Sequence, residues 1–152
     1  MDANKPKPSK WQEPYSSARG LVNQGLNRIR QGYMRPGIKA LFDVSNKDFE
    51  RASSQDFGFG LGPRINAAGR LEDMTIGIKC LLSNDYDKAY EYAKELNSLN
   101  ERRKEIEKDM KEFAWERVDL EKQKNNFTRV VFGEDFHEGV IGINLHFWNR
   151  SQ

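Results

Sequence analysis

Apolar residues recur at the three- and four-residue spacing of an α-helix along most of the chain. The first predicted helix runs over residues 19–32, because a glycine commonly ends a helix. A second is predicted to start at Pro36, since proline suits a first helical turn. Residues 45–48 predict a turn or a cap for a third, short helix, and Asp73 or Thr75 would cap a fourth. The inner face of the second helix would consist of Ile38, Leu41 and Phe42. The apolar residues of the first helix are Leu21, Val22, Leu26 and Ile29, and those of the fourth are Ile76, Ile78, Leu81 and Leu82.

The clearest helical pattern runs from about Tyr86 to about Lys122. It contains no glycine or proline, and charged residues fill most positions between the apolar ones. At 1.5 Å per residue such a helix would span roughly 50 Å. Its single narrow apolar stripe fits two alternatives, a coiled-coil arm or a helical strut between two lobes. The stripe consists of Ala89, Ala93, Leu96, Leu99, Ile106, Met110 and Phe113.

The two ends of the chain have different patterns. Residues 1–18 are predicted to be disordered, because three prolines interrupt any regular helix and lysines and serines fill the gaps. Near the other end, residues 128–132 predict a short strand, followed by a polar loop and then glycines with branched residues. That order is typical of the first strand–helix unit of an α/β domain. Because too few residues follow Ile143 to complete a sheet, the expected fold class is a mostly α fragment of an α/β protein.

Composition excludes several function classes. The 152 residues are 37% hydrophobic and 32% charged, and no apolar run approaches the roughly 20 residues of a membrane helix. The N-terminal residues lack the apolar stretch of a secretory signal, so a cytoplasmic location is expected. A single cysteine, Cys80, excludes internal disulfides and a cysteine zinc site, and its apolar surroundings predict a core position. Two histidines, His137 and His146, are too few for a histidine metal cluster.

The segment 57–70 holds four glycines and one proline in fourteen residues, which predicts an irregular backbone rather than a plain helix. Arg64 and Arg70 flank its small residues, with Asn66 between them. Arginine can fork onto phosphate oxygens, and an amide can add a further bond, so the segment predicts a phosphate cradle. The alternative is a glycine-rich turn whose arginines pair with the carboxylates of residues 72–73.

His137 is the second candidate for an anion contact. It follows the predicted strand and precedes Gly139 and a helix start, which places it well to donate to a phosphate; the alternative is an ordinary surface histidine. Residues 1–39 carry a net charge of +6 within a total of +2, so this basic end can meet phosphate; the alternative, which this charge alone favours, is a soluble tail with scattered charges. Residues 102–104 are basic too, but the glutamates around them predict a solvated, ion-paired helix face. The carboxylate pairs at 72–73 and 134–135 lack the converging Asp and His ligands of a two-metal centre, so no metal site is predicted.

Five segments between residues 19 and 143 together resemble the RecJ family of single-stranded-DNA-specific exonucleases, in the DHH phosphoesterase superfamily. The most specific are Leu-Gly-Pro-Arg-Ile-Asn-Ala-Ala-Gly-Arg-Leu and His-x-Gly-Val-Ile-Gly-Ile. The segments occur in the order and at the spacing of that family, and they cover residues 23–29, 35–41, 61–71, 95–107 and 137–143.

The resemblance implies degradation of single-stranded DNA from its 5′ end, in recombination and repair, with Mg²⁺ or Mn²⁺. It also implies that five residues lie at the DNA phosphates, namely Arg64, Asn66, Arg70, His137 and Gly139. The family's metal-ligand motifs, including Asp-His-His, and its later Gly-Gly-His motif have no match in this sequence. No metal ion is therefore expected to bind this chain, and the chain by itself is expected to have no nuclease activity.

The resemblance also divides the chain into parts. Residues 19–84 would be the helical, C-terminal end of the DHH catalytic lobe, 85–123 the long connecting helix, and 124–143 the start of the DHH-associated lobe with its first strand. Residues 1–18 and 144–152 would be non-matching tails. Two alternatives stay open: a non-enzymatic helical module that self-associates through the long helix, and a DHH phosphodiesterase acting on short oligonucleotides or cyclic dinucleotides.

Overall fold

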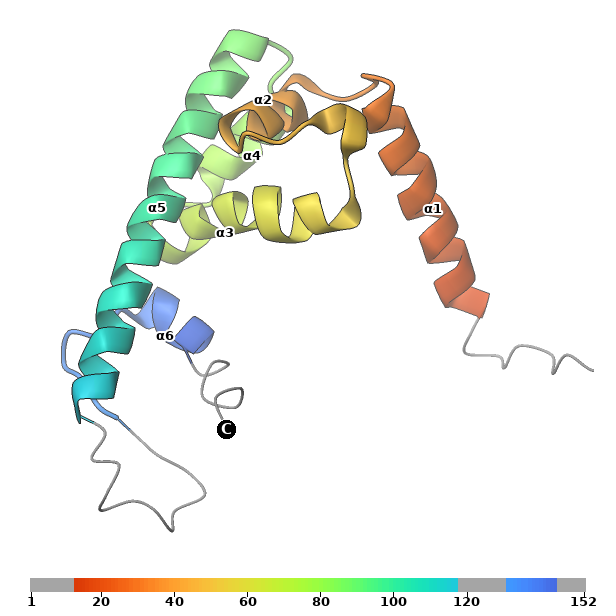
Figure 1. Cartoon of the computed structure of the whole chain (residues 1–152). Coiled ribbons are helices and arrows are strands. Elements are labelled where there is room, and N and C mark those ends of the chain that lie inside the picture. Colours follow the sequence, from red (N-terminus) through yellow and green to blue (C-terminus); the bar gives the residue numbers. More distant parts are fainter. Residues whose placement is uncertain (1–12, 118–130, 145–152) are drawn as a thin grey trace, which may run out of the picture.

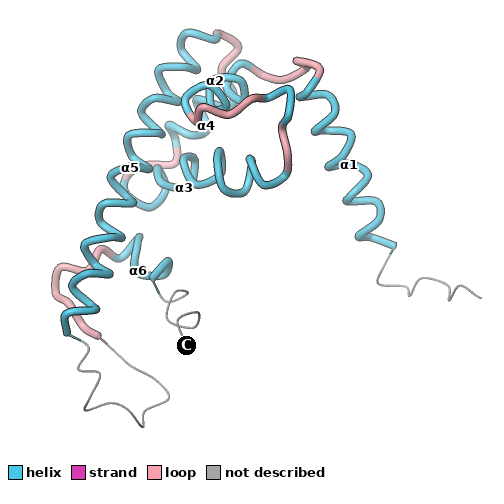
Figure 2. The backbone as a smooth tube through the Cα atoms, viewed as in Figure 1, coloured by secondary structure: helices cyan, strands magenta, loops and turns pink. Residues whose placement is uncertain are grey.

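The computed structural model describes residues 13–117 and 131–144 of the chain (Figure 1). All regular secondary structure within these residues is helical (Figure 2). In chain order the elements are α1 (Glu13–Arg30), α2 (Pro36–Val44), the 3-10 turn η1 (Phe49–Arg51), the π-helical turn η2 (Asp56–Leu61), α3 (Gly62–Leu71), α4 (Thr75–Leu82), α5 (Tyr86–Arg117) and α6 (Glu138–Asn144).

Helix α5 is the spine of the fold. Helices α2, α3 and α4 all pack against its N-terminal half, and α6 packs against it further along. In Figure 1, α5 forms one side of an arch and α1 forms the other, while α3 runs between them. Helix α1 meets the rest of the molecule at η1, where Arg30 Nε donates to the carbonyl of Ala52 at 2.9 Å.

The long predicted helix is confirmed over Tyr86–Arg117, and its remaining residues lie outside the described part of the chain. Asp85 caps its start, because the Asp85 carboxylate accepts from the backbone N–H of Lys88 at 3.0 Å. The apolar stripe faces α2, α3 and α4, where Ala89, Ala93 and Leu96 are fully buried. The self-association alternative depended on this apolar face. Over this part of α5, the face packs instead against helices of the same chain.

The core lies between α5 and the three helices that cross it. Many of its residues are small, so helix backbones can approach closely. The Phe42 and Phe57 rings fill the wider space and meet edge to face, with their centroids 5.6 Å apart. Cys80 has no exposed surface, which confirms its predicted core position. The other buried residues of this cluster are Ala40, Leu41, Ala52, Leu61, Ala67, Ala68, Ala89, Ala93, Leu96 and Leu99.

Helix α1 starts earlier than predicted. It begins at Glu13, inside the predicted disordered tail, and Pro14 is compatible with this start because no backbone N–H donor is required in the first turn. Two apolar residues of its helical pattern, Leu21 and Val22, are 71% and 54% exposed. Since α1 touches little beyond η1, only its C-terminal turns reach the core.

The glycine-rich segment is helical, which corrects the prediction of an irregular backbone. Residues 56–61 form one wide π turn, and α3 follows directly with Pro63 in its first turn. Glycine makes a helix less stable without forbidding it, and burial of Ala67 and Ala68 against the core offsets that cost. Because most backbone N–H groups within α3 bond to carbonyls one turn earlier, they are not free to cradle a phosphate.

The mostly helical part of the predicted fold class is confirmed, but the strand is not. Of residues 128–132 the structure describes only Val131 and Phe132, which have no regular secondary structure. The predicted second, third and fourth helices correspond to α2, η1 and α4, and Asp48 caps η1 by accepting from the Glu50 N–H. Among the described helices, none is both long and apolar enough to cross a membrane.

Alkaline pH is expected to destabilise the fold through Cys80. Burial raises the pKa of the Cys80 thiol to about 11 from an ordinary value of 9.0. The unfolded chain therefore loses this proton at lower pH than the folded chain, and the free energy of unfolding falls from pH 9 upward, by roughly 2 to 3 kcal/mol beyond pH 11. Urea unfolding at several pH values would measure this. Cys80→Ala is the control, and an equal decline in both proteins would contradict the assignment to the thiol.

Candidate nucleic-acid interface

The three predicted phosphate contacts on α3 do not form one cradle. Asn66 and Arg70 are one helical turn apart and share a face, whereas Arg64 is directed at α5. Asn66 and Arg70 are exposed, and Arg64 is half-buried. The structure thus separates the group into an Arg64 site beside α5 and a second site at the C-terminal end of α3.

Arg64 joins the π turn to the spine helix. Its Nη1 donates to the carbonyl of Gly60 at 2.7 Å, and its Nε donates to Asn97 Oδ1 at 2.8 Å. The pKa of Arg64 lies below its ordinary value, because burial lowers it by more than the nearby charge of Glu101 raises it. Both of its hydrogen-bond acceptors are neutral, so the guanidinium is held in a fixed orientation with its charge not cancelled by a bonded carboxylate.

Arg70, His137 and Gly139 come together where α3 meets α6, and this group is called the α3–α6 junction below. Arg70 Nη1 donates to the carbonyl of Gly139 at 2.7 Å, and the Gly139 N–H donates to His137 Nδ1 at 3.1 Å. A Cβ at position 139 would lie 2.2 Å from the Arg70 carbonyl oxygen, so only glycine permits this approach. The two motifs singled out in the sequence therefore meet in space.

The α3–α6 junction leaves several N–H donors without a partner among the described residues. His137 accepts at Nδ1, so in the neutral ring the hydrogen is on Nε2, which can donate to an anion. Arg70 uses one of its five N–H donors on Gly139. Asn66, one turn before Arg70, exposes its side-chain amide. Such fixed, uncompensated donors are what a phosphate group requires.

The alternative pairing of these arginines with the adjacent carboxylates is wrong. Glu72 instead pairs with Arg102 on α5 at 3.7 Å. Asp73 accepts from the Thr75 N–H at 3.0 Å, and it lies one residue before Met74, which occupies the N-cap position of α4 in place of the predicted Asp73 or Thr75. Both arginines of α3 are thereby left to bond carbonyl or amide oxygens.

A polar row on α5 was missed by the sequence interpretation. Asn97, Asn100, Arg103 and Glu107 recur at helical spacing, and Asn100 and Glu107 are only 1% and 8% exposed. Arg103 bonds Glu107 at 2.8 Å in this row, so the predicted solvated face is wrong for Arg103, although Lys104 forms a solvated pair with Glu101. Two asparagines at positions expected to be apolar were the signal in the sequence, because such residues need buried partners.

The described residues do not fit a divalent-metal centre. Within residues 13–117 and 131–144, no three His, Cys, Asp or Glu side chains are grouped so that they could hold a metal ion. The side chains of Arg64 and of the α3–α6 junction instead offer N–H donors and positive charge.

Comparison with known proteins finds relatives of this chain among the exonucleases. No model of a protein family matches the chain. The single-stranded-DNA-specific exonucleases RecJ of Dickeya dadantii and Escherichia coli are each 44% identical to it over 126 residues. The chain matches a segment of RecJ. The match covers 81% of this chain but 22% of each RecJ protein, so the chain spans about a fifth of the length of these relatives.

The fold matches RecJ as well. A crystal structure of RecJ from Thermus thermophilus in complex with Mn²⁺ superposes with a TM-score of 0.71 at 30% identity, over 83% of this chain and 18% of that RecJ chain. RecJ from the same source has also been solved in complex with Mg²⁺. The resemblance seen in the sequence motifs is confirmed by both comparisons.

Proposed function

We propose that this chain is part of a RecJ-like exonuclease that hydrolyses the phosphodiester bonds of single-stranded DNA from the 5′ end, in cytoplasmic DNA recombination and repair. The observation that carries the proposal is 44% identity over 126 residues to single-stranded-DNA-specific exonucleases. The meeting of the two most specific motifs at the α3–α6 junction supports it, because both would then face the same strand.

In this proposal the described residues bind and orient the strand. Arg64, Arg70 and Asn66 donate to phosphate oxygens, and His137 donates from Nε2. Gly139 keeps α6 close enough to α3 for Arg70 and His137 to act on one phosphate. Donors that are already held in place lose little freedom when the strand binds, which improves both affinity and alignment.

The remaining parts of the proposal concern the whole protein. Helices α1 to α4 would be the helical end of the DHH lobe, α5 the connecting helix, and α6 the start of the DHH-associated lobe. Mg²⁺ or Mn²⁺ would be held by residues other than those described here. The chain by itself would then bind single-stranded DNA weakly and would not cut it.

A chimaera tests the proposed function. The 126 matched residues would replace the corresponding segment of Escherichia coli RecJ, and degradation of 5′-labelled and 3′-labelled single-stranded DNA would be measured with Mg²⁺ or Mn²⁺. We expect the chimaera to degrade single-stranded DNA and to leave duplex DNA intact, like the parent RecJ measured beside it. A chimaera that folds like the parent but leaves single-stranded DNA intact would contradict the proposal.

A further inference from the structure

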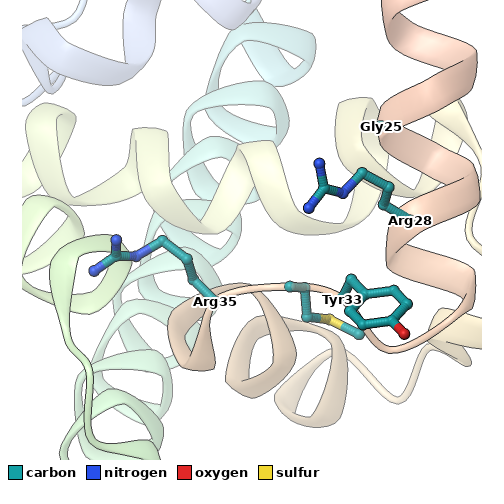
Figure 3. A pocket seen from close by; sticks show the side chains of 5 residues that line it. Gly25, Arg28, Tyr33 and Arg35 are labelled. Atoms are coloured by element: carbon teal, nitrogen blue, oxygen red, sulfur yellow. The ribbon is translucent and has the colours of Figure 1, made fainter.

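A shallow hollow lies where α1 connects to α2, away from the α3–α6 junction. Its volume is about 500 Å³, and it is lined by Gly25, Arg28, Tyr33, Met34 and Arg35. Figure 3 shows the guanidinium groups of Arg28 and Arg35 extending on the same side of the α1–α2 connection. None of these residues belongs to the α3–α6 junction or to the Arg64 site.

The backbone holds Tyr33 and Arg28 together. The Tyr33 N–H donates to the carbonyl of Arg28 at 2.9 Å, and the Gly32 N–H donates to the carbonyl of Ile29 at 2.8 Å. These two bonds form the Schellman motif that ends many helices. Gly32 has a φ of +83°, a conformation that glycine adopts readily and other residues do not. The backbone of Tyr33 is therefore held one turn from Arg28 before any ligand binds.

The positive charge of the hollow is not compensated. Arg35 is anchored by neutral acceptors only: its Nη2 donates to the Leu82 carbonyl at 2.7 Å and to Asn84 Oδ1 at 2.9 Å. Arg28 has no hydrogen-bond or ion-pair partner among the described residues, and its side chain is exposed. The surrounding sequence adds to this charge, because residues 18–42 contain no Asp or Glu and hold five basic residues, Arg19, Arg28, Arg30, Arg35 and Lys39.

The Tyr33 ring supplies an apolar surface beside these charges. It is 68% exposed and takes part in no ring contact within the described part of the chain. An exposed aromatic ring that lines the same hollow as two arginines suits a nucleotide, because the base can stack on the ring while the phosphate takes the charge. A protein partner would need a larger apolar patch than this one ring.

We propose that this hollow binds one nucleotide of a single nucleic-acid strand, with the base stacked on Tyr33 and the phosphate bonded to Arg28. Arg35, already anchored to α4, adds long-range attraction rather than a flexible contact. The inference rests on the proposed function and deepens it, because it gives the strand a second point of attachment, at the α1–α2 connection.

The test measures binding of the whole chain to fluorescently labelled oligothymidylate at low salt. Tyr33→Ala and Arg28→Ala are each expected to weaken binding by about 5- to 100-fold, the range for losing one stacked base or one charged contact. Tyr33→Phe should bind like the unaltered chain, because the ring and not the hydroxyl makes the contact. Arg19→Ala, which removes an exposed arginine of α1 outside the hollow, is the matched control and should change affinity less than twofold.

Two further measurements separate stacking from charge. An abasic strand of equal length has no base to stack on the ring, so the unaltered chain and Tyr33→Ala should bind it equally weakly. Arg28→Ala should lower the slope of log affinity against log salt by about 0.7, the value for one phosphate contact on a single strand. Far-UV circular dichroism of each variant checks that the helices are kept, as the exposure of both side chains leads us to expect.

Several outcomes would overturn the inference. No binding by the unaltered chain at low salt, equal losses in Arg28→Ala and Arg19→Ala, or no loss in Tyr33→Ala would each do so. If the chimaera is active and any of these results is found, the proposed function is kept and the nucleotide site is rejected. An inactive chimaera with Tyr33-dependent binding by the chain would instead reject the proposed function and keep the nucleotide site.

Discussion

Replacing Leu96 by alanine is expected to lower the free energy of unfolding by about 2 to 5 kcal/mol. Leu96 has no exposed surface and lies in the core, on the face of α5 against which α2, α3 and α4 pack. The substitution removes the buried side-chain atoms and leaves a cavity that three separate helices would have to close. Urea unfolding followed by circular dichroism measures the change, and the slope of the transition shows whether the unfolding stays cooperative.

The matched control is Leu21→Ala, the same substitution in the interior of another helix. Leu21 is 71% exposed, so its removal costs little burial, and alanine is at least as good a helix former. We expect a change within about 0.5 kcal/mol for this variant. Equal effects of the two substitutions would contradict a core packed on α5.

Replacing Arg64 by alanine is expected to lower the rate of single-stranded-DNA degradation by about 10- to 100-fold in the active chimaera, the cost of one charge-assisted bond to phosphate. Arg64 is held by the Gly60 carbonyl and by Asn97, so its guanidinium is already oriented when the strand arrives. Arg64→Lys should recover part of the loss, because lysine keeps the charge without the planar fork. Steady-state kinetics on labelled single-stranded DNA measure each rate.

Asn97→Ala separates phosphate binding from local structure. This variant removes the 2.8 Å bond that steadies Arg64 but leaves the guanidinium in place. We expect a smaller loss of rate than for Arg64→Ala and an unchanged dependence of binding on salt. The same loss of rate in both variants, with no change in salt dependence in either, would show that Arg64 only holds the π turn against α5.

The sequence predicts a helix well where the residues within a single helical turn are enough to indicate it. Tyr86–Arg117 lacks glycine and proline and repeats its apolar positions, so α5 could be read directly. Pro36 predicted the start of α2 and Gly32 the end of α1 for the same reason, since each acts on the backbone of its own turn. The segment 56–71 was misjudged because glycine only lowers helix stability, and the packing that outweighs this cost comes from residues distant in sequence.

The sequence likewise indicated only part of the candidate site. Arg64, Asn66, Arg70, His137 and Gly139 could be chosen from motifs, but their grouping could not. Arg64 is turned to Asn97, and Arg70 reaches Gly139, contacts that join residues far apart in the chain. Asn100 shows the same limit, since its position in the apolar pattern of α5 signals burial but does not show which residues cover it.

The amino-acid sequence by itself determined the starts of α2, α4 and α5, the excess of positive charge in residues 18–42 and the likeness to RecJ. Only the tertiary structure decided that Arg64 and Arg70 are directed to different places, that the His137 segment meets the end of α3, and that Tyr33 and Arg28 line one hollow. The physical reason is the range of the forces: capping and periodicity act within one turn, whereas the direction of a side chain depends on which distant helix packs against it.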